Sequence, residues 1–64
     1  MKEKLKENGV VINIIKMMRK DSMWYDAYVS FDGRSFFKVG NKFETKEDAE
    51  KEVENYAIQK LGLA

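Results

Sequence analysis

Residues 23–39 of the chain are MWYDAYVSFDGRSFFKV, and this stretch decides the fold. From Met23 to Phe31, β-branched and aromatic residues alternate with polar or small ones, which predicts a half-buried β-strand. Asp32-Gly33 then predicts a tight hairpin turn, because both central residues of a type I′ turn need positive φ. The segment Arg34–Val39 is the predicted returning strand.

The alternation divides the side chains of these two strands between two faces. The first face carries Tyr25, Ala27, Val29 and Phe31, together with Phe37 and Val39. The second face carries Trp24, Asp26, Tyr28 and Ser30, together with Arg34, Phe36 and Lys38. The first set is the more apolar, so we expect it to face the core.

A further strand is predicted on the N-terminal side of this hairpin. Val10–Met18 is rich in β-branched residues, and the polar segment Arg19–Ser22 would be the turn that follows it. Val11, Asn13, Ile15 and Met17 would share the second face. Residues 1–9 are charged and end in Gly9, and we expect them to be a flexible N-terminal segment.

On the C-terminal side the chain predicts one helix. Gly40-Asn41 is expected to end the third strand, and Thr45 to cap a helix over Lys46–Leu61 with Gly62 just beyond its end. A stripe of apolar residues at helical spacing would pack on the sheet: Ala49, Val53, Tyr56, Ala57 and Leu61. Residues 10–64 are therefore predicted to form a single α+β domain, a three-stranded antiparallel β-meander packed against one C-terminal α-helix.

The composition excludes several classes of function. The 64 residues are 44% hydrophobic and 36% charged, with no Cys and no His. Disulfide scaffolds, Cys/His zinc sites, thiol catalysis and imidazole-dependent triads are thereby excluded. We expect no enzymatic activity, cofactor, metal or small-molecule substrate. No apolar run approaches the roughly 20 residues of a membrane span, so the expected location is the cytoplasm.

The net charge of +1 is unevenly distributed. Residues 1–43 hold nine Lys/Arg and five acids, a difference of +4, whereas residues 44–64 hold three Lys and six acids, a difference of −3. A basic sheet could approach nucleic acid while the acidic helix points away. The same split also arises without function, because acidic residues favour helix starts.

The second face of the sheet would expose large apolar groups beside cations. Aromatic rings among Arg and Lys suit stacking on bases, and the same residue types are enriched at protein interfaces. A third interpretation is that residues 1–9 fold over this face, or that the two faces are exchanged.

Two families of DNA-binding domain resemble the C-terminal half. Lys42–Ala64 is similar to the end of the plant ethylene-response-factor (APETALA-type) domain, through an F-x-T-x-x-x-A helix start at Phe43, Thr45 and Ala49 and through Ala57 and Gly62. The arm-type domain of phage-type tyrosine integrases has a similar layout, and its F-x-T-K-x-x-A start also matches Lys46.

Both resemblances imply a sheet that enters the DNA major groove and reads bases from its exposed strands. The matching positions here are Trp24, Asp26, Tyr28 and Ser30 in the middle strand and Arg34, Phe36 and Lys38 in the third. A weaker resemblance, to the last part of the double-stranded-RNA-binding domain, lacks that family's lysines, because the helix start here is mostly acidic.

The leading hypothesis is a small DNA-binding module that contacts the duplex with its exposed sheet face. Its candidate binding residues are Lys16, Arg19, Trp24, Tyr28, Arg34, Phe36 and Lys38. The alternative hypothesis is a small protein-interaction module, either a phage-type inhibitor or a homodimer, that docks through the same aromatic face.

Overall fold

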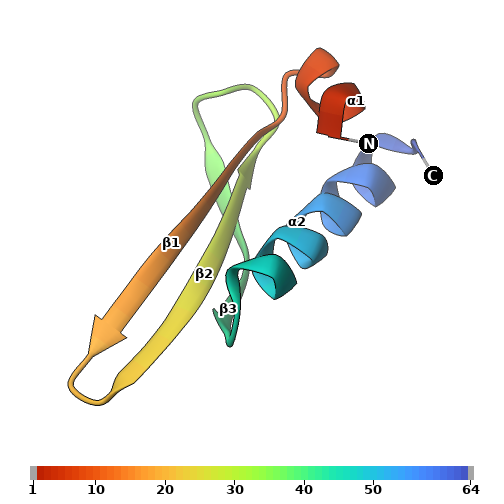
Figure 1. Cartoon of the computed structure of the whole chain (residues 1–64). Helices are drawn as coiled ribbons and strands as arrows, with labels where there is room; N and C mark the ends of the chain where they lie inside the picture. Colours follow the sequence, from red (N-terminus) through yellow and green to blue (C-terminus); the bar gives the residue numbers. More distant parts are fainter. Residues whose placement is uncertain (1, 64) are drawn as a thin grey trace.

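The computed structural model describes residues 2–63 and confirms the predicted βββα architecture. Its elements, drawn in Figure 1, are α1 (Lys2–Glu7), β1 (Val11–Arg19), β2 (Ser22–Ser30), β3 (Phe36–Phe43) and α2 (Lys46–Leu61). The strands form one antiparallel sheet in the order β1-β2-β3. Helix α2 lies along one face of this sheet.

Strands β1 and β2 form a long regular hairpin. Their register pairs nine residues of each strand without interruption, from Val11 opposite Ser30 to Arg19 opposite Ser22. The turn between them is Lys20-Asp21, with Lys20 in the left-handed region at φ 51°. The tip of this hairpin projects past the start of α2 (Figure 1).

The connection from β2 to β3 corrects the prediction of a two-residue turn. Ser30 pairs with Phe36, so residues 31–35 form a five-residue loop and Arg34 lies outside the strand. The side chain of Asp32 organises this loop, because its Oδ1 accepts the backbone N–H groups of Arg34 and Ser35 at 2.8 and 2.9 Å. The Asp32 carboxylate therefore provides hydrogen-bond acceptors for backbone N–H groups of the loop. Among residues 31–35, only Gly33 has positive φ (79°).

Strand β3 also ends later than predicted. Gly40-Asn41 does not end it; the strand continues to Phe43, with register irregularities where Ala27 of β2 faces Gly40. These bulges place extra residues on β3 and accommodate the glycine. The ring of Phe43 occupies the space beside Gly40, where a Cβ would lie 2.6 Å from the ring Cζ.

Helix α2 has the predicted bounds because its caps are local. The Thr45 hydroxyl accepts the backbone N–H of Asp48 at 3.1 Å. At the other end, Gly62 has φ 69°, and the N–H groups of Gly62 and Leu63 bond to the carbonyls of Gln59 and Ile58. This pair of bonds is a Schellman motif, and it ends the helix.

The core lies between α2 and one face of the sheet, which we call the covered face. Ala27 and Val29 of β2 and Ala49, Val53 and Ala57 of α2 are all fully buried. The predicted orientation is thereby confirmed: the Tyr25 side of β2 faces the helix. Phe37, predicted in the core, lies opposite Val29 but is 55% exposed at the β3 edge.

The N-terminal segment, for which the sequence suggested flexibility, contains the short helix α1. Leu5 of this helix is only 2% exposed and belongs to the core cluster. The N–H of Val10 bonds to the Leu5 carbonyl at 2.9 Å, and Gly9 makes the turn with φ 78°.

Candidate binding surface

The face of the sheet opposite α2 is the candidate site, and we call it the open face. In an antiparallel sheet, residues that are directly opposite each other point to the same side. The register therefore gathers on this face residues from all three strands: Val11, Asn13, Ile15, Met17, Arg19, Ser22, Trp24, Asp26, Tyr28, Ser30, Phe36 and Lys38. Trp24 lies opposite Met17, and Tyr28 lies between Asn13 and Lys38.

An apolar stripe runs along β1 on this face. Val11, Ile15 and Met17 are 41%, 44% and 37% exposed, and Phe36 on the far strand is 40% exposed. Trp24 and Tyr28 of the central strand are half-buried between them. The open face therefore exposes large apolar groups, as the alternation predicted.

A buried carboxylate lies in the middle of the open face. Alternation places Asp26 on the second face, which was expected to be exposed, but this residue is only 4% exposed. Its Oδ1 accepts the backbone N–H of Lys42 at 3.3 Å, and its Oδ2 lies 3.6 Å from Nζ of Lys38. Asp26 therefore ties β2 to the irregular end of β3, and it offsets the charge of Lys38.

A second group of residues forms a basic corner at the hairpin end of the sheet. Arg19, Ser22, Trp24 and Lys42 line an open pocket of about 400 Å³. Two cations, a hydroxyl and an indole thus surround one hollow. Such a set can bind a phosphate by charge and pack a sugar or base against the ring.

The structure brings together five of the seven predicted binding residues. Arg19, Trp24, Tyr28, Phe36 and Lys38 share the open face. Lys16 lies opposite Tyr25, so its Cα–Cβ bond points to the covered side, where the hairpin extends past α2. Arg34 is exposed in the 31–35 loop, which corrects its placement in the third strand.

Lys42 and Ser22 were not identified from the sequence. Lys42 follows Gly40-Asn41, which was expected to end the strand, so the sequence pattern did not assign its side chain to either face of the sheet. In the structure Lys42 has φ 58°, an unusual conformation for lysine. The available signal was the apolar Phe43, which indicates that the strand continues beyond the glycine.

The loop beyond the other end of the open face is held by Asp32. Backbone N–H bonds from Ser35 and Arg34, with the hydroxyl of Ser30, hold the pKa of the Asp32 carboxyl below its ordinary value. Ser30 Oγ also accepts the N–H of Gly33 at 2.8 Å. The Asp32 carboxylate is therefore engaged in the loop structure.

The charges of the two layers have opposite signs. Helix α2 carries five acids and three lysines, whereas the open face carries Arg19 and Lys38 against Asp26, with Lys42 at its corner. The acidic helix lies behind the sheet as seen from the open face. A polyanion on the open face would therefore approach the basic layer first.

Two kinds of feature are absent from the residues that the structure describes. Among residues 2–63, no group of three or more His, Cys, Asp or Glu side chains is placed to hold a metal ion. Within the same residues, no helix has the length and apolar character to cross a membrane. Comparisons with protein-family models, curated proteins and solved structures found no significant match to the chain.

Proposed function

We propose that the protein binds duplex DNA through the open face, with the basic corner as the centre of the contact. The observation that carries this proposal is the layered charge: cations and aromatic rings gather on the open face, and the acidic helix lies behind it. Electrostatic attraction to phosphates supplies most of the affinity of such a surface.

The β1–β2 hairpin has the shape that this contact needs. The major groove of B-DNA is about 12 Å wide and admits a two-stranded β-ribbon. The hairpin projects past α2 and carries three cations near its tip, Lys16, Arg19 and Lys20, against one acid, Asp21. It would enter the groove while the cations contact the phosphates on either side.

Each part of the site then has a role. Arg19 and Lys42 contact phosphates, and Trp24 and Tyr28 pack on sugars or base edges. Arg34 contacts the DNA backbone from the opposite end of the sheet. Lys38 contributes less, because Asp26 already lies 3.6 Å from its Nζ. The small number of base-reading side chains favours binding with low sequence specificity.

Binding of a fluorescently labelled duplex, followed by anisotropy at several salt concentrations, tests this function. We expect Arg19→Glu and Lys42→Glu each to weaken binding and to reduce the salt slope by about 0.9, the value for one lost phosphate contact. Lys51→Glu, the same charge reversal on the exposed side of α2, is the matched control and should bind as the unmodified protein does. Equal losses from all three variants would show that only net charge matters and would remove the proposed site.

A second candidate function is docking onto another protein. The exposed side chains of Val11, Ile15, Met17 and Phe36 favour it, because large apolar groups gathered on one face of a small domain mark interaction surfaces. Such docking would respond little to salt and would be weakened by Phe36→Ser, whereas DNA binding would weaken steeply with salt. Failure to bind any duplex at low salt, with the folded state verified by circular dichroism, would leave docking as the better proposal.

A further inference from the structure

Strand β1 is an unprotected edge of the sheet. Within residues 2–63 it pairs only with β2, so the N–H and C=O groups on its other side have no strand partner. All nine of its residues keep a regular register with β2, whereas the irregularities lie between β2 and β3. Bulges, prolines and charged side chains usually protect edge strands; β1 has no bulge or proline, and Lys16 is the one charged residue in its interior.

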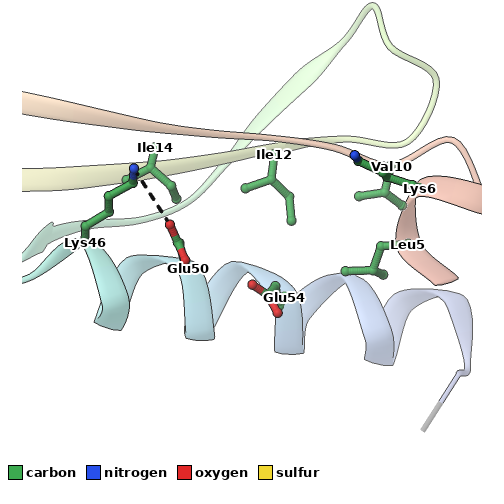
Figure 2. Close-up of a pocket in the computed structure, with 8 residues that line it drawn as sticks. All are labelled: Leu5, Lys6, Val10, Ile12, Ile14, Lys46, Glu50 and Glu54. Atoms are coloured by element: carbon green, nitrogen blue, oxygen red, sulfur yellow. Dashed lines mark ion pairs between the residues drawn. The ribbon is translucent and has the colours of Figure 1, made fainter. Parts of the chain in front are cut away.

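A groove with four apolar and four charged lining residues runs beside this edge on the covered side. It has a volume of about 360 Å³ between β1 and α2. In Figure 2, Leu5, Val10, Ile12 and Ile14 form its apolar wall. Glu50 and Glu54 of α2 lie across from them, and Nζ of Lys46 is 4.0 Å from Glu50. A strand added to the β1 edge would gain backbone partners and place alternate side chains beside this groove.

We propose that this strand is β1 of a second copy of the chain, paired antiparallel about a two-fold axis at Ile15. The bounds of β1, Val11–Arg19, are symmetric about Ile15, so this register pairs all nine residues with their counterparts. The two sheets then become one six-stranded sheet. This is a contact through strand edges and differs from docking through the open face.

The charge pattern of β1 supports self-pairing. In this register Lys16 lies opposite Ile14 of the second copy, and Arg19 lies opposite Val11. No cation lies directly opposite another, although the two Lys16 residues are diagonal neighbours across the axis and their charges need an acidic partner nearby. Lys16 of one copy also comes beside Ile14 of the other, on the side where Glu50 and Glu54 line the groove together with Lys6 and Lys46, so it would share these carboxylates with the two lysines.

The same register explains side chains that the single chain leaves in solvent. Met18 is 73% exposed, and the register places it opposite Ile12 of the second copy, beside the groove. Ile15, 44% exposed, packs on its own counterpart at the axis. Self-association of this kind adds apolar burial to a domain too small to bury a large core.

The pairing uses the strand edge and leaves the open face uncovered, but the β1–β2 hairpin can enter a groove as a two-stranded ribbon only in the single chain. Because opposite residues point to the same side, the open faces of the two copies lie on one surface of the six-stranded sheet. The basic corners would then lie at its two ends, related by the two-fold axis.

Sedimentation and cross-linking of the full chain test this arrangement. We expect a species of about 15 kDa, twice the 7.5 kDa of the chain, at tens of micromolar concentration. The chain has no cysteine, so Ile15→Cys introduces a single thiol that would face its counterpart and oxidise to a disulfide dimer. Asn13→Cys is the matched control, because its thiols would lie four residues out of register, roughly 13 Å apart, and should not cross-link.

A pair of lysine substitutions separates this interface from others. Ile15→Lys places two cations at the axis and should give the monomer mass, whereas Phe36→Lys, on the same face but on β3, should leave the dimer intact. Ile15 is exposed, so the variant should remain folded, and circular dichroism verifies that it does. Three results would each overturn the proposal. The first is a wild-type chain that stays monomeric at about 200 µM. The others are a dimer that Phe36→Lys dissociates and Ile15→Lys does not, and equal cross-linking at positions 13 and 15.

Discussion

Replacing Gly40 by alanine tests whether the packing of β3 depends on a missing side chain. An alanine Cβ at this position would lie 2.6 Å from Cζ and 2.9 Å from Cε2 of Phe43. Ordinary contacts begin at about 3.4 Å, so the ring would have to move by roughly 0.8 Å. The ring packs against the core cluster, so it cannot move freely.

The expected magnitude follows from two opposing effects. Overpacking costs about 1–3 kcal/mol, and alanine recovers about 0.4–1 kcal/mol by restricting the unfolded chain. Gly40→Ala should therefore lower the free energy of unfolding by about 0.5–2 kcal/mol. Urea unfolding, followed by circular dichroism, should show a midpoint lower by roughly 0.5–2 M, for a slope near 1 kcal/mol/M.

A double-mutant cycle isolates the contact with the ring. Phe43→Leu keeps an apolar side chain but removes Cζ and Cε2, so alanine at position 40 should then be neutral or slightly stabilising. If Gly40→Ala stabilises the unmodified protein, or costs as much in the Phe43→Leu background, the reasoning is refuted.

Three further predictions concern stability. Leu5→Ala should lower the free energy of unfolding by about 2–4 kcal/mol, because Leu5 is 2% exposed; a loss below about 0.5 kcal/mol in urea unfolding would mean that α1 does not pack on the core. Thr45→Ala removes the acceptor of the Asp48 N–H and should cost about 1 kcal/mol, whereas Thr45→Ser should cost little, as measured by thermal unfolding. Because the pKa of Asp32 is lowered in the folded state, its contribution to stability is complete above its ordinary pKa and is lost as pH falls through the lowered pKa. Asp32→Asn should therefore flatten the fall of unfolding free energy at acidic pH, and an unchanged profile would contradict this role.

The sequence was most informative where the determinants of structure are local. The bounds of α2 were predicted because Thr45 and Gly62 cap it through bonds to residues three or four positions away. The face of β2 that packs on the helix followed from simple alternation.

The errors have long-range causes. The end of β3 depends on bulges opposite Ala27 and on the Phe43 ring beside Gly40. The alternation of residues within one strand carries no information about either contact. Alternation also placed Asp26 at the surface, whereas Lys38 and the Lys42 backbone surround it.

The candidate site was predicted in part for the same reasons. Trp24, Tyr28 and Phe36 were assigned to one face because they lie in regular strand segments. The basic corner was not predicted, since it requires the hairpin end of β1 and β2 to meet the irregular end of β3 at Lys42.

The salt dependence of DNA binding, measured on the fluorescence of Trp24, tests the central claim most directly. Trp24 is the one tryptophan of the chain and lines the basic corner, so its emission reports contact at that site. If Lys16, Arg19, Lys20, Arg34 and Lys42 each neutralise a phosphate, duplex DNA should change the emission, and the logarithm of the affinity should fall against the logarithm of salt with a slope of about −4.5. A slope near zero, or no change in emission with duplex at low salt, would contradict the account.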